Sequence, residues 1–133
     1  LDPEVMKWCE ENADAAGGRF EIAHDLEEGY DRADFVYSRN WMTAGFYDDM
    51  IKNGVDAAKK KEIEIAAKYD DWITTKDWMA KTNDAYFTHC GPVDRNAEVT
   101  DEVCDSPKSI VYDVAENRLH VQKAIMALTM GKM

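Results

Sequence analysis

Helical and extended patterns alternate along this chain of 133 residues, and this alternation restricts its fold more than any other feature. Asp2 followed by Pro3 is typical of a helix start, and Gly17-Gly18 ends that helix. Strands are predicted at 20–23, 34–38, 85–88 and 110–112. Strands separated by helices predict an α/β fold, in which a mostly parallel sheet is covered by helices on both faces.

The remaining helices are predicted where a capping residue precedes side chains at helical spacing. They begin at Asp25, Asp48, Thr74, Thr100 and Asp113. The second is interrupted at Asn53-Gly54. The last is expected to carry Val121, Ile125 and Leu128 inward. No linker rich in Pro, Gly or Ser divides the chain, so one domain spanning residues 1–133 is expected.

Three short segments are expected to meet at one crevice of this fold, because ligands of parallel sheets bind beyond the carboxyl ends of the strands. These segments are 39–41, 89–92 and 116–118. Arg118 falls in the first turn of the predicted last helix, where free backbone N–H groups and a guanidinium suit an anionic oxygen. From these residues alone, a capped helix with solvated charges is the favoured explanation of the segment 116–118.

The other polar residues of this crevice also admit purely structural explanations. His89 and Cys90 are neighbours on a strand and point to opposite faces, so they are not expected to form a nucleophile and base pair. A metal site of His89, Cys90 and Asp94 matches no zinc spacing, and no metal ligand is predicted. Core packing or solvated charge would explain the rest, which are Trp41, Arg39, Asp94 and Glu98.

Charge and cysteine content limit the partners and the compartment of the protein. A formal net charge of -11 argues against a nucleic-acid groove or an anionic membrane surface, since both bind clustered Lys and Arg. Three cysteines without CxxC spacing indicate neither a disulfide framework nor a structural zinc site. With no apolar stretch of roughly 20 residues and no leader pattern, the chain is expected to be cytoplasmic.

Several segments in a fixed order resemble the carbamoyltransferase family. His89-Cys90-Gly91-Pro92 is similar to the family's His-Cys-Leu-Pro motif, and 98–103 with Ser106-Pro107 resembles the stretch that follows it. The run 116–127, within the closing helix, is similar to the N-acetylornithine branch, and so is the segment 33–37 leading to Arg39-Asn40-Trp41. The resemblance covers essentially the whole chain.

The resemblance implies transfer of a carbamoyl group from carbamoyl phosphate to an amine, by an enzyme with two α/β domains. A homotrimer with shared sites, no metal and no organic cofactor are also implied, so that catalysis depends on positioning and charge. Cys90 would contact the reacting groups without acting as a nucleophile, and Arg118 would bind carbamoyl phosphate. The amine substrate would lie against His89, Gly91, Pro92, Arg39, Trp41, Asp94 and Glu98.

Four residues depart from the branch that the chain most resembles. Gly91 replaces the leucine of the motif, and Asp94 stands where the branch has an arginine, so the amine need not be acetylornithine. Glu98 falls at the position of a carboxylated lysine, and Arg39 at that of a lysine. Because Glu98 supplies an anion directly, we expect an ion pair between Arg39 and Glu98 that lines the amine pocket.

The motifs with which the family binds carbamoyl phosphate, Ser-Thr-Arg-Thr and His-Pro-x-Gln, do not occur in the sequence. The chain is therefore expected to be the carboxy-terminal, amine-binding portion of a longer protein, with the carbamoyl-phosphate domain outside it. A catalytically silent binding or assembly module is the alternative, to which Gly91 and Asp94 point. A generic nucleotide-binding domain is disfavoured because the sequence has no glycine-rich phosphate loop.

Overall fold

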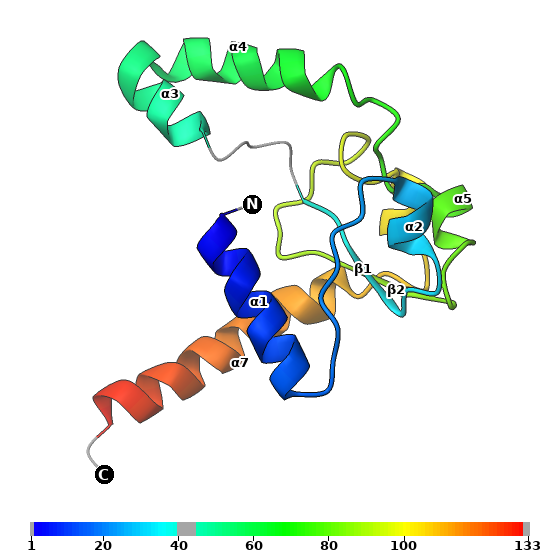
Figure 1. The fold of residues 1–133 in the computed structure, drawn as a ribbon, viewed down its shortest axis with the longest axis vertical. Helices are drawn as coiled ribbons and strands as arrows, with labels where there is room; N and C mark the ends of the chain where they lie inside the picture. The colour runs from blue at the N-terminus through cyan, green and yellow to red at the C-terminus, as the bar shows by residue number, and fades with distance from the viewer. Residues whose placement is uncertain (1, 40–44, 132–133) are drawn as a thin grey trace.

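Helices and short strands alternate in the computed structural model of the chain, which describes residues 2–39 and 45–131 (Figure 1). In chain order the elements are α1 (Pro3–Ala15), α2 (Leu26–Tyr30), β1 (Phe35–Tyr37), α3 (Phe46–Asn53), α4 (Val55–Ala66), α5 (Lys76–Met79), β2 (Tyr86–Thr88), α6 (Asp101–Cys104) and α7 (Val111–Met130). The fold is of the α/β class, as the sequence predicts.

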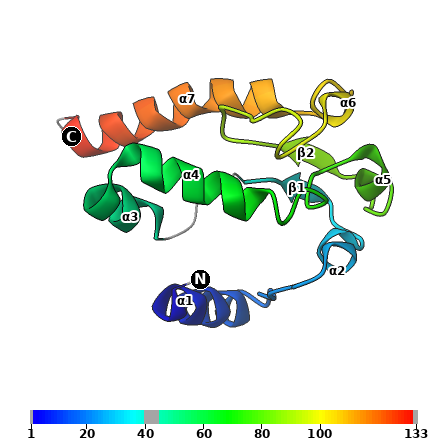
Figure 2. The ribbon, with the colours of Figure 1, turned by 90° about the horizontal axis from the view of Figure 1, so that it is seen from above.

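The two strands β1 and β2 pair in parallel, with Val36 opposite Phe87. In the view of Figure 2 they lie between α7 on one side and α1 on the other. The strands predicted at 34–38 and 85–88 are thus confirmed. Because the strands are parallel, the residues that follow them lie at the same edge of the sheet, and the candidate site is built there.

Two further strands predicted from the sequence do not form. Beside β2 the chain makes a bridge from Ser109 to Phe87 and then enters α7 at Val111, which leaves no length for a strand at 110–112. Residues 20–23 run as coil, without backbone hydrogen bonds to another segment among the residues described. A strand needs a hydrogen-bonded neighbour, which a local sequence pattern cannot supply.

Acidic residues cap the first two helices as predicted. Asp2 accepts a hydrogen bond of 2.8 Å from the N–H of Glu4, and Asp25 accepts one of 2.8 Å from the N–H of Glu27. The helices α3 and α4 are separated at Gly54, whose φ of 86° lies in the left-handed region that glycine reaches without strain. Local signals therefore determine these helix ends.

Asp25→Ala is expected to lower the free energy of unfolding by about 1 kcal/mol, because two N–H groups at the start of α2 lose their acceptor. Urea denaturation followed by circular dichroism measures this loss. Glu10→Ala, at an exposed position inside α1, is the matched control. An equal loss from both variants would contradict the capping role of Asp25.

The cap of α5 lies one residue beyond its predicted position. Thr75 accepts a hydrogen bond of 3.3 Å from the N–H of Trp78, in place of Thr74. Thr74 is instead buried, bridges to Val99 and shares a hydrogen bond of 2.7 Å with the Tyr30 hydroxyl. A buried tertiary contact overrides the local capping pattern at this position.

The core is small and lies around β2 and α6. It consists of Phe87, Val99, Val103 and Cys104, with Val36, Met79, Val93 and Val111 packed against it. After this contact α7 runs out past the sheet (Figure 1), so Val121, Ile125 and Leu128 are exposed and the prediction that they face inward is wrong. In the part of the chain that the structure describes, no helix is long and apolar enough to cross a membrane.

Candidate functional site

His89, at the exit of β2, is buried and contacts both a backbone donor and a carboxylate. The residue is 2% exposed, and its Nδ1 accepts a hydrogen bond of 2.9 Å from the Gly91 N–H. Nδ1 is therefore unprotonated, and the ring proton lies on Nε2. That nitrogen is 3.0 Å from Oε2 of Glu98 but does not satisfy the geometry of a directed hydrogen bond, so the attraction is mainly electrostatic.

Glu98 is the buried acid of the site. Its Oε2 also accepts a hydrogen bond of 3.3 Å from the Asp94 N–H. The expected ion pair with Arg39 is not formed within the described ranges, although Arg39 and Glu98 line the same pocket of about 400 Å³. Glu98 contacts His89 instead, because a buried carboxylate needs a polar partner while the exposed Arg39 remains solvated.

The turn after His89 presents backbone to the site. Gly91 has a φ of 63°, and the Gly91–Pro92 peptide bond is cis. A Cβ at Gly91 would meet no atom within 4 Å among the described residues, so the absence of the leucine side chain leaves open space there. Gly91 and Pro92 also line a pocket of about 310 Å³ together with Tyr112 and Ala115 of α7.

Tyr37 is a residue of this site that the sequence analysis does not select. Its ring stacks on that of His89, with centroids 5.7 Å apart and an interplanar angle of 16°. Interaction with the Cys90 side chain raises the pKa of the Tyr37 hydroxyl above its ordinary value, and burial acts in the same direction. The sequence signal that could have identified it is its place near the end of the strand predicted at 34–38, two residues before Arg39.

Arg118 reaches the His89 turn from α7. Its Nη1 donates a hydrogen bond of 3.5 Å to the carbonyl oxygen of Cys90. Because α7 begins at Val111, Arg118 lies in the third turn, and the expectation that it accompanies the free N–H groups of a helix start is wrong. An anion at this place would therefore be bound by the guanidinium, which is exposed.

The remaining predicted residues do not form a separate cluster. Asp94 is exposed at the start of the loop that carries Glu98, and Trp41 lies outside the described residues. Over 2–39 and 45–131, no group of three His, Cys, Asp or Glu side chains is placed to hold a metal ion. The metal site considered for His89, Cys90 and Asp94 is therefore not formed.

Residues 1–129 match the family described as aspartate/ornithine carbamoyltransferase, Asp/Orn binding domain. The chain belongs to this family. The N-acetylornithine carbamoyltransferase of Xanthomonas campestris pv. campestris is 39% identical to it over 132 residues, which are 99% of this chain and 36% of the relative. The ornithine carbamoyltransferase of Thermococcus kodakarensis is 40% identical over 131 residues, which are 98% of this chain and 38% of the relative.

Solved carbamoyltransferase structures share the fold of the chain. Acetylornithine transcarbamylase complexed with acetylcitrulline superposes with a TM-score of 0.81 at 40% identity, covering 96% of this chain and 36% of that one. A mutant of N-acetyl-L-ornithine transcarbamylase complexed with carbamyl phosphate and N-succinyl-L-norvaline gives 0.80 at 39% identity, with the same coverage. The chain thus spans little more than one third of the length of the relatives that it matches.

Proposed function

We propose that the protein transfers a carbamoyl group from carbamoyl phosphate to the side-chain amine of ornithine or of an N-acylated ornithine-like substrate. This chain supplies the wall that binds the amine, and the domain that binds carbamoyl phosphate lies outside residues 1–133. The strongest support is that Arg118, the turn at Cys90 and the pair of His89 and Glu98 come together in a chain that matches the Asp/Orn binding domain.

The proposed reaction forms a C–N bond between the neutral amine and the carbonyl carbon of carbamoyl phosphate. The C–O bond to phosphate breaks and phosphate leaves with its electron pair. The amine loses one proton, which the leaving phosphate takes up, and the product is a citrulline-type ureido compound. Cys90 and the backbone carbonyl of Gly91 lie beside the reacting groups in this proposal, and Arg118 offsets the negative charge of carbamoyl phosphate. Neither a metal nor an organic cofactor takes part.

The pocket shared by Arg39 and Glu98 supports an amino-acid-like amine as the substrate. A cation and an acid on its walls match a carboxylate and an ammonium group of the substrate. His89 and the Gly91-Pro92 turn complete the amine-binding wall in this proposal. Asp94 is exposed at the start of the turn that carries Glu98, and in this proposal its negative charge disfavours a second carboxylate on the substrate.

We extend the proposal to the assembly and setting of the complete protein. It is a homotrimer that acts in the cytoplasm, in arginine biosynthesis, with sites shared between subunits. Cys9, Cys90 and Cys104 are free thiols, which is compatible with a reducing compartment. Size-exclusion chromatography with light scattering tests the trimer directly.

Turnover by the full-length polypeptide, or by this chain joined to the carbamoyl-phosphate domain of a relative, tests the proposed function. The protein is incubated with carbamoyl phosphate and with ornithine, acetylornithine, succinylornithine or putrescine, and the ureido product is measured. We expect turnover with at least one of the three amino-acid amines, and more slowly with putrescine. A folded protein that carbamoylates none of the four amines would instead favour a catalytically silent module.

A further inference from the structure

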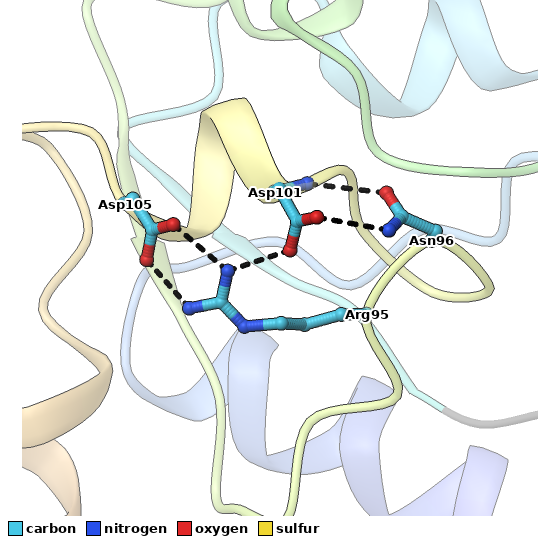
Figure 3. Close-up of polar contacts among 4 residues, drawn as sticks. All are labelled: Arg95, Asn96, Asp101 and Asp105. Atoms are coloured by element: carbon cyan, nitrogen blue, oxygen red, sulfur yellow. Dashed lines mark hydrogen bonds and ion pairs between the residues drawn. The ribbon is translucent and has the colours of Figure 1, made fainter.

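Arg95 joins the loop after the His89 turn to the short helix α6, as Figure 3 shows. Its Nη1 donates a hydrogen bond of 2.6 Å to Asp101, and its two terminal nitrogens contact both oxygens of Asp105, at 2.9 and 2.5 Å. Asn96 donates a further hydrogen bond of 3.0 Å to Asp101 and accepts one from its N–H. We call Arg95, Asn96, Asp101 and Asp105 the Arg95 clasp.

One end of the Arg95 clasp is attached to the core. Asp101 opens α6 and Asp105 follows it, so the two carboxylates flank Val103 and Cys104, which are core residues. Hydrogen bonds from Arg95 lower the pKa of both carboxyl groups below their ordinary value, so both remain ionised at neutral pH. The guanidinium is therefore held by two charged acceptors whose backbone is fixed.

The other end of the Arg95 clasp is the turn that carries Glu98. The Glu98 N–H donates a hydrogen bond of 2.9 Å to the Asp94 carbonyl, and the Asp94 N–H donates to the Glu98 carboxylate. Asn96, with a φ of 60°, donates its N–H to the Val99 carbonyl at 2.7 Å. The turn is thus closed by its own hydrogen bonds, which connect the residues on either side of Arg95 to Glu98 and Val99.

We propose that Arg95 is a positioning residue, which holds the 94–98 turn so that the Glu98 carboxylate stays against His89. His89 in turn accepts the Gly91 N–H and so fixes the backbone beside Cys90. This proposal rests on the proposed function, in which the backbone beside Cys90 faces the substrates. Without the clasp, the turn keeps its attachment through the Thr74 N–H and the Glu98 carbonyl, so it loosens without unfolding.

Arg95→Ala in the full-length protein is expected to lower kcat/KM for the amine about 10- to 100-fold, because small displacements of reacting groups are costly. KM for carbamoyl phosphate should stay within about twofold, since Arg118 binds it from α7 and is not part of the Arg95 clasp. Arg95→Lys should recover part of the loss, because a lysine can bond one carboxylate but cannot hold two as a planar fork. Asp105→Asn weakens the Arg95 clasp at its α6 end. It should likewise lower kcat/KM for the amine and leave KM for carbamoyl phosphate nearly unchanged.

A spectroscopic measurement separates this proposal from the proposed function. Nitrogen-15 NMR of the His89 imidazole reports on both ring nitrogens, and Arg95→Ala and Asp105→Asn should both shift its signals. Arg19→Ala, which removes another exposed arginine that pairs with Glu21, is the matched control and should leave them unchanged. If the wild-type protein turns over no amine, the proposed function fails, and the His89 signals alone decide the role of Arg95.

The positioning role is overturned by either of two results. One is that Arg95→Ala or Asp105→Asn leaves the His89 signals as in the wild type. The other is that an active wild type loses activity on Arg95→Ala only in proportion to the fraction of unfolded protein, with equal effects on both substrates. The positioning role is supported if Arg95→Ala lowers kcat/KM for the amine without raising KM for carbamoyl phosphate, and if Arg95→Lys recovers part of the activity.

Discussion

Arg118→Ala is expected to lower kcat/KM for carbamoyl phosphate by about 10²- to 10³-fold, the loss typical of removing one preorganised donor to a developing negative charge. Arg118 reaches the turn after β2 from α7, and its Nη1 lies 3.5 Å from the Cys90 carbonyl. The guanidinium is exposed and this hydrogen bond is long, so the residue contributes little to stability. Activity should therefore fall while the fold is kept.

Steady-state kinetics with varied carbamoyl phosphate measure the effect of Arg118→Ala, and circular dichroism melting checks the fold. Lys123→Ala is the matched control, because it removes an exposed cation from the same helix. Arg118→Lys keeps the charge but loses the planar fork, so its activity should lie between those of the wild type and the alanine variant. Unchanged kinetics in Arg118→Ala would remove the residue from the proposed mechanism.

The sequence predicts those parts of the fold that depend on neighbouring residues. Asp25 caps α2 through its own side chain, and Gly54 breaks the long helical pattern because its φ is positive. The strands β1 and β2 are also predicted, since both consist mainly of β-branched and aromatic residues. In each case the chemical cause lies within a few residues of its effect.

The incorrect predictions all depend on partners that are distant in sequence. Whether residues 20–23 or 110–112 form strands depends on a neighbouring strand, and the start of α7 depends on the bridge between Ser109 and Phe87. Glu98 was expected to pair with Arg39, yet it pairs with His89 because both residues are buried behind the turn. The sequence pattern at Arg39 and Glu98 contains no information on the burial of Glu98 beside His89, which decides its partner.

The exposed face of α7 shows the same dependence on distant partners. Helical spacing predicts that Val121, Ile125 and Leu128 face inward, but a spacing pattern only says that a face is apolar. It does not say which segment covers that face.

Glu98→Ala is expected to lower the free energy of unfolding by about 1–3 kcal/mol, the loss typical of leaving a buried polar group without its hydrogen-bond partner. Glu98 is 4% exposed, and its Oε2 lies 3.0 Å from Nε2 of the equally buried His89. Removing the carboxylate takes the acceptor from the Asp94 N–H and the electrostatic partner from the buried Nε2 of His89. It also leaves a cavity where the side chain was.

Glu98→Gln and Glu102→Ala separate the causes of this loss. Glutamine keeps the volume and an oxygen for the Asp94 N–H but lacks the charge, so Glu98→Gln should cost less than Glu98→Ala. Glu102 pairs with Lys76 at the surface, so Glu102→Ala should change stability by no more than about 0.5 kcal/mol. Urea titration measures the free energy of unfolding of the three variants, each made in the full-length protein. Equal losses from Glu98→Ala and Glu102→Ala would show that the contact between Glu98 and His89 does not stabilise the fold.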